Sequence, residues 1–200
     1  LPSEREHTFT FGSFNNFKKI SDETVDTWST ILQNVSKSRL ILKSSTFCDV
    51  TMLLEKFKKN GVEHKIEIFE KKNFFKKKDH LDLYKRIDLA LDTFPYNGVT
   101  TTFEALWMNV PTIVLRGYNF NSRCGESIIR NTGINYLVAS NTNDYIQKAT
   151  SLSQDKKKLN EIRKLLFDQV LSSPLFDTRC FAKDFGDCFF EIFNNNSLNK

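Results

Sequence analysis

Hydrophobic and polar residues along the chain follow two alternating patterns. Short runs rich in β-branched and aromatic residues are separated by longer segments in which apolar residues recur every three or four positions. This alternation predicts a parallel sheet covered by helices. The expected strands are residues 7–14, 39–42, 65–69, 87–91, 112–115 and 136–139.

The segments between and after these runs have the capping residues of helices. Ser21 or Asp22 is expected to cap the first helix, and Gly61 to end the second. The expected helices are residues 22–35, 48–60, 79–85, 101–108, 122–131, 141–153, 156–171 and 178–193. The fold class predicted is therefore α/β, a Rossmann-like parallel sheet of about six strands with helices on both faces. We expect one domain over residues 1–193, followed by a frayed tail at 194–200.

Composition supports a globular domain with a sizeable core. The chain has 200 residues, 40% of them hydrophobic, and only 7 Gly and 4 Pro. Its net charge of +5 is compatible with phosphate-bearing ligands, nucleic acid or an anionic membrane surface. Lys-rich runs near residues 56–59 and 71–78 are typical of solvated faces, and none is interleaved with stacking aromatics in an RNA- or DNA-binding motif. We therefore expect no nucleic acid as a partner. Because no apolar run is long enough to span a membrane, we expect no membrane partner either.

The four cysteines indicate a reducing compartment rather than a metal site. Cys48, Cys124, Cys180 and Cys188 form no C-x-x-C pair, and the chain has only 3 His to complete a zinc set. We therefore expect free thiols, a cytoplasmic protein without signal peptide, and no metal.

The strongest local feature is the segment DTFPYNGVTTT at residues 92–102. A buried strand runs into an Asn-Gly turn, three threonines and then a helix, whose first N–H groups lack partners and favour an anion. The threonine hydroxyls add donors, and Gly98 permits a turn and a close approach to the ligand. Alternatively, Thr100 merely caps the helix and Glu104 lies in its dipole-favoured first turn. The residues alone leave these two interpretations equally balanced.

A wider stretch of sequence resembles a known family. IDLALDTFPYNGVTTTFEALWMNVPTIVL, followed by SRCGESII, is similar to the C-terminal catalytic region of the protein O-linked N-acetylglucosamine transferases. That family includes the plant SPINDLY-type O-fucosyltransferases and many bacterial relatives, and the similarity covers residues 8–193. Members have the GT-B fold, in which two Rossmann-like lobes hold the sugar nucleotide between them. The resemblance implies that this chain is the C-terminal, donor-binding lobe alone, without the helical repeats that often accompany the family.

The resemblance also implies roles for residues in two loops. In FNNFKKI at residues 14–20, Lys19 matches the lysine that contacts the donor diphosphate, and Asn16 a neighbouring polar contact. A fixed cation there offsets charge that builds on the leaving nucleotide diphosphate. His80 matches the family's base-stacking histidine, and Lys77 the lysine near the nucleoside. Without the resemblance, Lys19 and His80 would be read as ordinary surface residues.

The remaining donor-binding residues implied by the resemblance lie in the 92–107 segment. They are Asn97 and Gly98 in the turn, Thr100 and Thr101 as the phosphate-binding pair, Thr102 where relatives carry Gly or a third Thr, and Glu104 as the acidic residue that holds the ribose. Two positions depart from the animal enzymes. Val99 replaces a histidine that contacts the sugar nucleotide, and Leu83 replaces an arginine near the base, so the identity of the donor stays open.

The activity implied is glycosyl transfer with inversion to Ser or Thr hydroxyls of proteins, with UDP-N-acetylglucosamine as the favoured donor. The alternatives are a lobe that binds a GDP-linked deoxyhexose, a non-catalytic nucleotide-binding module that needs a partner lobe, and a transferase that acts on lipid or polysaccharide. No Asp-x-Asp motif is present, which agrees with transfer without a metal cofactor. The protein acceptor would be bound by an N-terminal lobe and repeats outside this chain.

Overall fold

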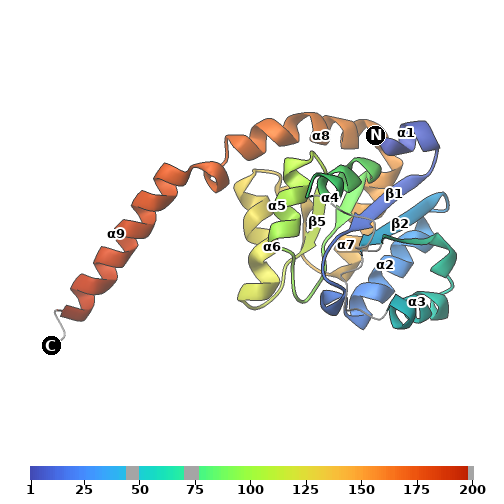
Figure 1. The fold of residues 1–200 in the computed structure, drawn as a ribbon, viewed down its shortest axis with the longest axis horizontal. Coiled ribbons are helices and arrows are strands. Elements are labelled where there is room, and N and C mark those ends of the chain that lie inside the picture. Colours follow the sequence, from blue (N-terminus) through green and yellow to red (C-terminus); the bar gives the residue numbers. More distant parts are fainter. Residues whose placement is uncertain (44–49, 70–76, 198–200) are drawn as a thin grey trace.

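The protein folds around a six-stranded sheet in which each paired strand runs parallel to its neighbour (Figure 1). This structure, a computed structural model, describes residues 1–43, 50–69 and 77–197, with the backbone alone at 77–79 and 196–197. The strand order is β3-β2-β1-β4-β5-β6. The strands are β1 (Phe9–Ser13), β2 (Ser38–Lys43), β3 (Ile66–Phe69), β4 (Leu89–Leu91), β5 (Thr112–Leu115) and β6 (Val138–Ala139).

Helices connect successive strands and close the chain. The α-helices are α1 (Pro2–Glu6), α2 (Asp22–Asn34), α3 (Val50–Lys59), α4 (Lys77–Leu83), α5 (Thr100–Trp107), α6 (Phe120–Asn131), α7 (Thr142–Gln154), α8 (Lys156–Leu171) and α9 (Thr178–Ser197). Short 3₁₀ turns are η1 (Phe17–Lys19), η2 (Glu63–Lys65), η4 (Tyr84–Arg86), η5 (Asn135–Leu137) and η6 (Pro174–Phe176). Helices α2, α3 and α7 lie together on one face of the sheet, and α5 and α6 cover the other (Figure 1).

The sheet is buried between these layers. Every residue of β1 is buried, as expected for a central parallel strand. Phe11 belongs to the larger hydrophobic cluster, which includes Trp28 of α2. Ile41 of β2 belongs to a second cluster with Tyr84 and Ala105, beneath η4 and α5. The predicted α/β fold with helices on both faces is therefore confirmed.

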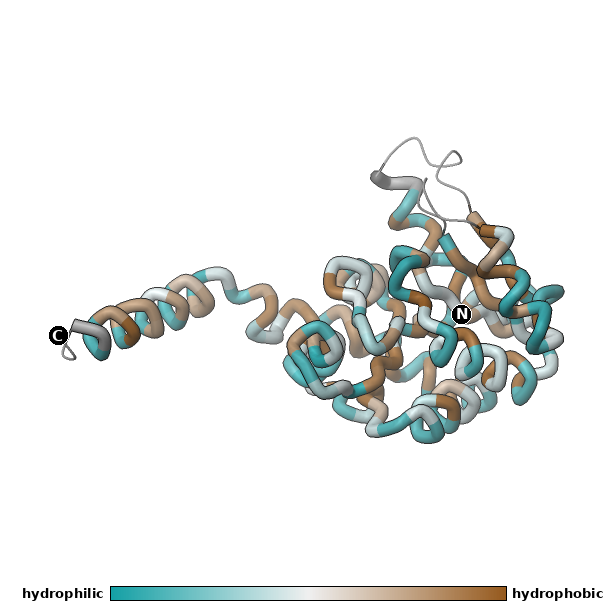
Figure 2. The backbone as a smooth tube through the Cα atoms, turned by 90° about the horizontal axis from the view of Figure 1, so that it is seen from below, coloured by the Kyte–Doolittle hydropathy of each residue, from teal (hydrophilic) through white to brown (hydrophobic). Residues whose placement is uncertain are grey.

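Three details differ from the sequence-based expectation. Helix α1 precedes the first strand and was not predicted. Strand β6 has only two residues, because η5 takes up the start of the expected run. Helix α9 continues to Ser197, past the point at Asn194 where a frayed tail is expected. This helix projects from the body of the molecule with exposed aromatic residues along it (Figures 1 and 2).

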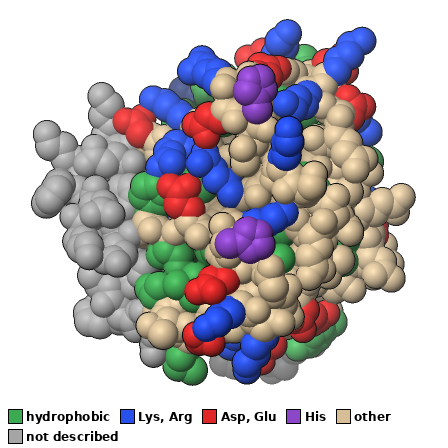
Figure 3. All heavy atoms as spheres, turned by 90° about the vertical axis from the view of Figure 1, so that its right-hand side faces the viewer, with side chains coloured by type: hydrophobic (Ala, Val, Ile, Leu, Met, Phe, Trp, Pro, Cys, Tyr) green, Lys and Arg blue, Asp and Glu red, His purple; other side chains and the backbone are tan. Residues whose placement is uncertain are grey.

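The lysines at the end of α3 lie on the surface, in agreement with a solvated face. Lys56 pairs with Asp22 at 2.5 Å, and Lys58 with Glu55 at 3.5 Å. Figure 3 shows this side of the molecule, where basic and acidic side chains are interspersed. Among the described helices none is long and apolar enough to cross a membrane. Cys48 and the lysines of residues 71–76 lie outside the described residues.

Candidate functional site

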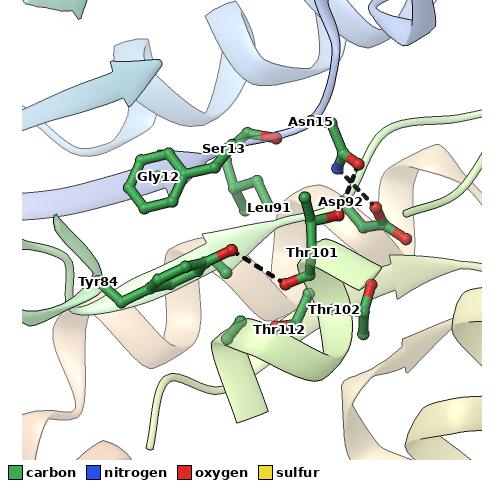
Figure 4. Close-up of a pocket in the computed structure, with 12 residues that line it drawn as sticks. Gly12, Ser13, Asn15, Tyr84, Leu91, Asp92, Thr101, Thr102 and Thr112 are labelled. Carbon is green, nitrogen blue, oxygen red and sulfur yellow. Dashed lines mark hydrogen bonds between the residues drawn. The ribbon is translucent and has the colours of Figure 1, made fainter. Parts of the chain in front are cut away.

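The sheet reverses its direction of growth between β1 and β4, which are direct neighbours in the strand order. Crevices at such a switch point, outside the carboxyl ends of the strands, are where open α/β sheets bind ligands. The segment after β1 leads into η1, and the segment after β4 leads into α5. Both therefore meet at this edge, around a small pocket between β1, β4 and α5 (Figure 4).

Asp92, the first residue after β4, organises the edge. Its side chain is buried, and Oδ1 accepts hydrogen bonds from the N–H groups of Thr93 (2.9 Å) and Gly98 (2.7 Å) and from Nδ2 of Asn15 (3.0 Å). Oδ2 has no hydrogen-bond partner in the described part of the chain. Burial raises the pKa of Asp92 to about 7, although the three donors and the Lys19 ammonium oppose the rise. The carboxyl group thus fixes the course of the loop that leads to α5.

Gly98 is required by packing within this loop. A Cβ at this position would lie 2.3 Å from Oγ1 of Thr101, 2.7 Å from Oδ1 of Asn15 and 2.9 Å from Oδ1 of Asp92. Real Cβ atoms do not approach other atoms so closely. The sequence interpretation, that glycine allows a turn and the approach of a ligand, therefore omits its main role, which is to let three polar side chains converge.

Asn97 holds the loop to its neighbours instead of facing outward. The side chain is fully buried, with Nδ2 donating to the Thr93 carbonyl (2.9 Å) and Oδ1 accepting from the N–H of Gly125 in α6 (3.2 Å). A ligand at this edge would consequently meet the backbone of Asn97 and not its amide. The Asn97 side chain therefore holds the loop in place, and it does not point to where the predicted contact with the donor would be made.

Helix α5 starts without a side-chain cap. Its N-cap residue is Val99, which offers no acceptor, so the cap interpretation of Thr100 is wrong. Thr100 is exposed at the first helical position, whereas the hydroxyl of Thr102 is buried and donates to the Gly98 carbonyl (3.1 Å). Because its hydroxyl is already used, Thr102 can donate to an anion only through its backbone N–H. The uncapped, positive end of the helix lies at the edge of the sheet.

Lys19 brings a positive charge to the same place. Its Nζ donates to the carbonyl of Asn97 (2.9 Å) and lies 4.0 Å from the ring centroid of Tyr96. Partial burial lowers the pKa of Lys19, against the attraction of Asp92. Asn16, by contrast, is exposed and uses its side-chain oxygen to cap η1 at the N–H of Lys18. The predicted diphosphate lysine thus lies beside the loop that starts α5.

His80 and Glu104 form a second polar group beside α5. Nε2 of His80 is 2.8 Å from Oε2 of Glu104, and Nζ of Lys43 is 2.8 Å from Nδ1. Because an ammonium group can only donate, Nδ1 accepts and Nε2 carries the hydrogen given to Glu104. Tyr84 also donates to Glu104 (3.2 Å). Burial opposes ionisation, but the bonds from His80 and Tyr84 lower the pKa of Glu104 overall.

The position of Glu104 corrects one expectation. It lies beyond the first turn of α5, which contains no acidic residue. Its carboxylate instead borders an open groove of about 320 Å³ that Thr100 and Leu81 also line, so a ligand at the start of α5 can reach it. Lys77 begins α4, but its side chain lies outside the described part of the structure.

Sequence reasoning missed four residues that build the site, namely Asn15, Lys43, Tyr84 and Asp92. Three of them had a readable signal. Asp92 directly follows β4, Asn15 is the second residue after β1, and Lys43 ends β2, so all three lie at the carboxyl edge of the sheet. Polar residues at that edge of a parallel sheet are candidates for a site even without a motif.

The fold is that found in glycosyltransferases of the GT-B type. A solved O-GlcNAc transferase from Thermobaculum terrenum superposes with a TM-score of 0.86 and 31% identity, over 94% of this chain and 36% of that one. The family model described as glycosyl transferase family 41 matches residues 3–185. The chain belongs to this family.

Two further comparisons define how much of a relative the chain represents. It is 37% identical over 179 residues to a protein of Eustoma exaltatum subsp. russellianum named probable UDP-N-acetylglucosamine–peptide N-acetylglucosaminyltransferase SPINDLY. That match covers 88% of this chain but 19% of the plant protein. The C-terminal domain of the Francisella tularensis glycosyl transferase LpcC has the same fold, with a TM-score of 0.65 at 15% identity, over 86% of this chain and 90% of that domain.

Proposed function

We propose that this chain is the donor-binding lobe of an inverting glycosyltransferase that transfers N-acetylglucosamine from UDP-N-acetylglucosamine to Ser and Thr hydroxyls of proteins. One observation carries the proposal: the Lys19 ammonium and the uncapped start of α5 converge on the loop at Asn97 and Val99. A cation and a row of N–H groups at one edge suit a diphosphate. The name of the plant SPINDLY relative supplies the donor and the peptide acceptor.

In the proposed reaction, the lobe stabilises the leaving group. As the bond from the sugar to the diphosphate breaks, negative charge grows on the phosphate oxygens beside Lys19 and the N–H groups of α5. The Thr100 hydroxyl adds a donor at the first helical position. Because these groups supply the positive charge, transfer proceeds without a divalent metal. Among the described residues, no group of three or more His, Cys, Asp or Glu side chains is arranged to hold one.

The nucleoside is assigned to the other side of α5. His80 and Tyr84 both bond to Oε2 of Glu104, and we assign the other carboxylate oxygen, Oε1, to the ribose hydroxyls. His80 is held at both ring nitrogens, so its ring face is what it can offer a base. Lys77, at the start of α4, is assigned to the nucleoside on the family match, and Asn16 to a polar contact near the diphosphate.

The acceptor side of the reaction is proposed to come from a second lobe. The chain spans about a fifth of the length of the plant relatives, which therefore contain much more protein than this lobe. A protein acceptor and a cytoplasmic location are further parts of the proposal. Co-expression with an N-terminal lobe of the family, followed by a peptide glycosylation assay, would test the acceptor, and cell fractionation the location.

Calorimetric titration of the chain with UDP, GDP and their sugars tests the donor site. UDP and UDP-N-acetylglucosamine are expected to bind more tightly than the guanine compounds, with affinity unchanged by a metal chelator. Lys19→Met removes the charge and is expected to weaken UDP binding about tenfold or more. Lys18→Met, at the exposed neighbouring lysine, is the matched control. Tighter binding of GDP would favour the O-fucosyltransferase alternative, and binding of no nucleotide would refute the site.

A further inference from the structure

A chain of hydrogen bonds links the loops after β1 and β4 to helix α5 (Figure 4). Nδ2 of Asn15 donates to Oδ1 of Asp92 at 3.0 Å, and Oγ1 of Thr101 donates to Oδ1 of Asn15 at 2.7 Å. Asn15 is 5% exposed, and Asp92 1%. These hydrogen bonds therefore form a connection inside the protein, directly behind the uncapped start of α5.

The direction of these bonds is fixed by the chemistry of Asp92. Its Oδ1 already accepts the N–H groups of Thr93 and Gly98, so this oxygen has no hydrogen to give. Asn15 must turn its NH₂ group toward Asp92 and its oxygen toward Thr101. An amide oxygen only accepts, so the Thr101 hydroxyl must be the donor, and its hydrogen points into the protein.

Packing restricts the Thr101 side chain on the side of Gly98. Its Oγ1 would be only 2.3 Å from a Cβ on Gly98, so the hydroxyl lies against the backbone of that glycine. Threonine, being branched at Cβ, also has few χ1 choices in a helix. The single hydrogen of the Tyr84 hydroxyl is shared between Glu104 (3.2 Å) and the Thr101 carbonyl (3.1 Å). The residue is thus held from both its side chain and its backbone.

We propose that Asn15 is a positioning residue for the donor diphosphate. Held by Asp92, it commits the Thr101 hydroxyl hydrogen to the protein interior and sets the first turn of α5. Thr101 then serves the phosphate through its backbone N–H, and the hydroxyl that donates to the phosphate is that of Thr100. This inference rests on the proposed function. The sequence motif assigns phosphate binding to both threonines, whereas here Thr101 binds through its backbone N–H and Thr100 through its hydroxyl.

A double-mutant cycle on donor binding tests the proposal. Asn15→Ala and Thr101→Ala are each expected to weaken UDP-N-acetylglucosamine binding about tenfold, since each breaks the same connection. The double variant should then be no weaker than either single variant, because the two residues act through one bond. Thr101→Ser keeps the hydroxyl and should restore binding to within about twofold. Thr100→Ala should weaken binding independently, and its effect should multiply with that of Asn15→Ala.

Circular dichroism and thermal melting of each variant separate loss of binding from loss of fold. If Asn15→Ala unfolds the chain, the comparison of Thr101→Ala with Thr101→Ser and with Thr100→Ala decides the question. Multiplicative losses for Asn15→Ala and Thr101→Ala, or a loss for Thr101→Ala with none for Asn15→Ala, would overturn the proposal, as would normal binding by Thr100→Ala. If the unaltered chain binds no nucleotide, the proposed function itself fails. If it binds and the Asn15 variant binds equally well, only this inference fails.

Discussion

His80 donates its Nε2 hydrogen to Oε2 of Glu104 across 2.8 Å, which joins α4 to α5 at the groove beside the uncapped helix end. Lys43 holds the other ring nitrogen. The imidazole is therefore fixed in place and tautomer before any ligand binds. Such preorganisation lowers the entropic cost of binding, because the side chains need no ordering when the ligand arrives.

Breaking this pair should affect binding of the nucleoside more than stability. Glu104→Ala removes both the partner of His80 and the proposed ribose acceptor, so UDP affinity is expected to fall about tenfold. Glu104→Gln keeps one acceptor oxygen and should lose less. Calorimetry with UDP measures the effect, with Glu55→Ala on the surface of α3 as the control. Equal affinities for Glu104→Ala and the unaltered chain would exclude a ribose contact at this residue.

Gly98→Ala is expected to destabilise the protein and abolish donor binding. The added Cβ would collide with Thr101 and Asn15, and the loop must move to admit it. Overpacking of this kind costs about 1–3 kcal/mol. Urea unfolding measures the change.

Gly186→Ala is the matched control for that substitution. Gly186 lies in α9 with nothing within 4 Å of the position of an added Cβ. Alanine is a better helix former than glycine, so this variant should be stabilised by up to about 1 kcal/mol. A Gly98→Ala variant that behaves like Gly186→Ala would show that the loop has room to spare.

The sequence was a reliable guide to the fold because its signals are local. Strand β5 and helix α8 occupy the predicted residues, since apolar periodicity and flanking breakers define them. The site was less accessible. The FNNFKKI and NGVTTT segments locate two loops, but only the strand order shows that Asn15 and Asp92 face each other across 77 positions of sequence.

The sequence motif also does not show that its three threonines have different surroundings. Thr100, Thr101 and Thr102 look equivalent in sequence, yet one is exposed, one bonds to Asn15, and one is buried against Gly98. Helical geometry turns successive side chains by about 100°, so adjacent threonines must face different surroundings. Which surroundings each meets depends on tertiary packing, which no local pattern specifies.

Asp92 should make stability depend on pH. Its folded pKa of about 7 lies above its ordinary value of 3.8, so the folded state keeps the proton up to a higher pH than the unfolded chain does. The stabilisation is present below about pH 4 and is lost as the pH rises through 7. Between pH 5 and pH 8 the loss should amount to about 2–3 kcal/mol.

Urea unfolding of the unaltered chain and of Asp92→Asn at both pH values measures this loss. The neutral amide cannot titrate, so the difference between the two proteins isolates the carboxyl group from other ionising residues. Lys19, Tyr84 and Tyr145 are the charged or titratable groups that interact with Asp92, and all three are present in both proteins. Parallel pH profiles would show that Asp92 is ionised throughout this range.

Val99→Asp should make the fold more stable and donor binding weaker. Val99 is 42% exposed, so a polar side chain at this N-cap position is tolerated. A carboxylate there compensates the positive end of α5 and should stabilise the fold by about 0.5–1 kcal/mol. The same negative charge would compete with the donor diphosphate for the N–H groups, so UDP-N-acetylglucosamine should bind at least tenfold more weakly. Val99→Thr, similar in shape and uncharged, should show little of either effect. A Val99→Asp variant that gains stability and binds the donor normally would place the diphosphate away from the start of α5.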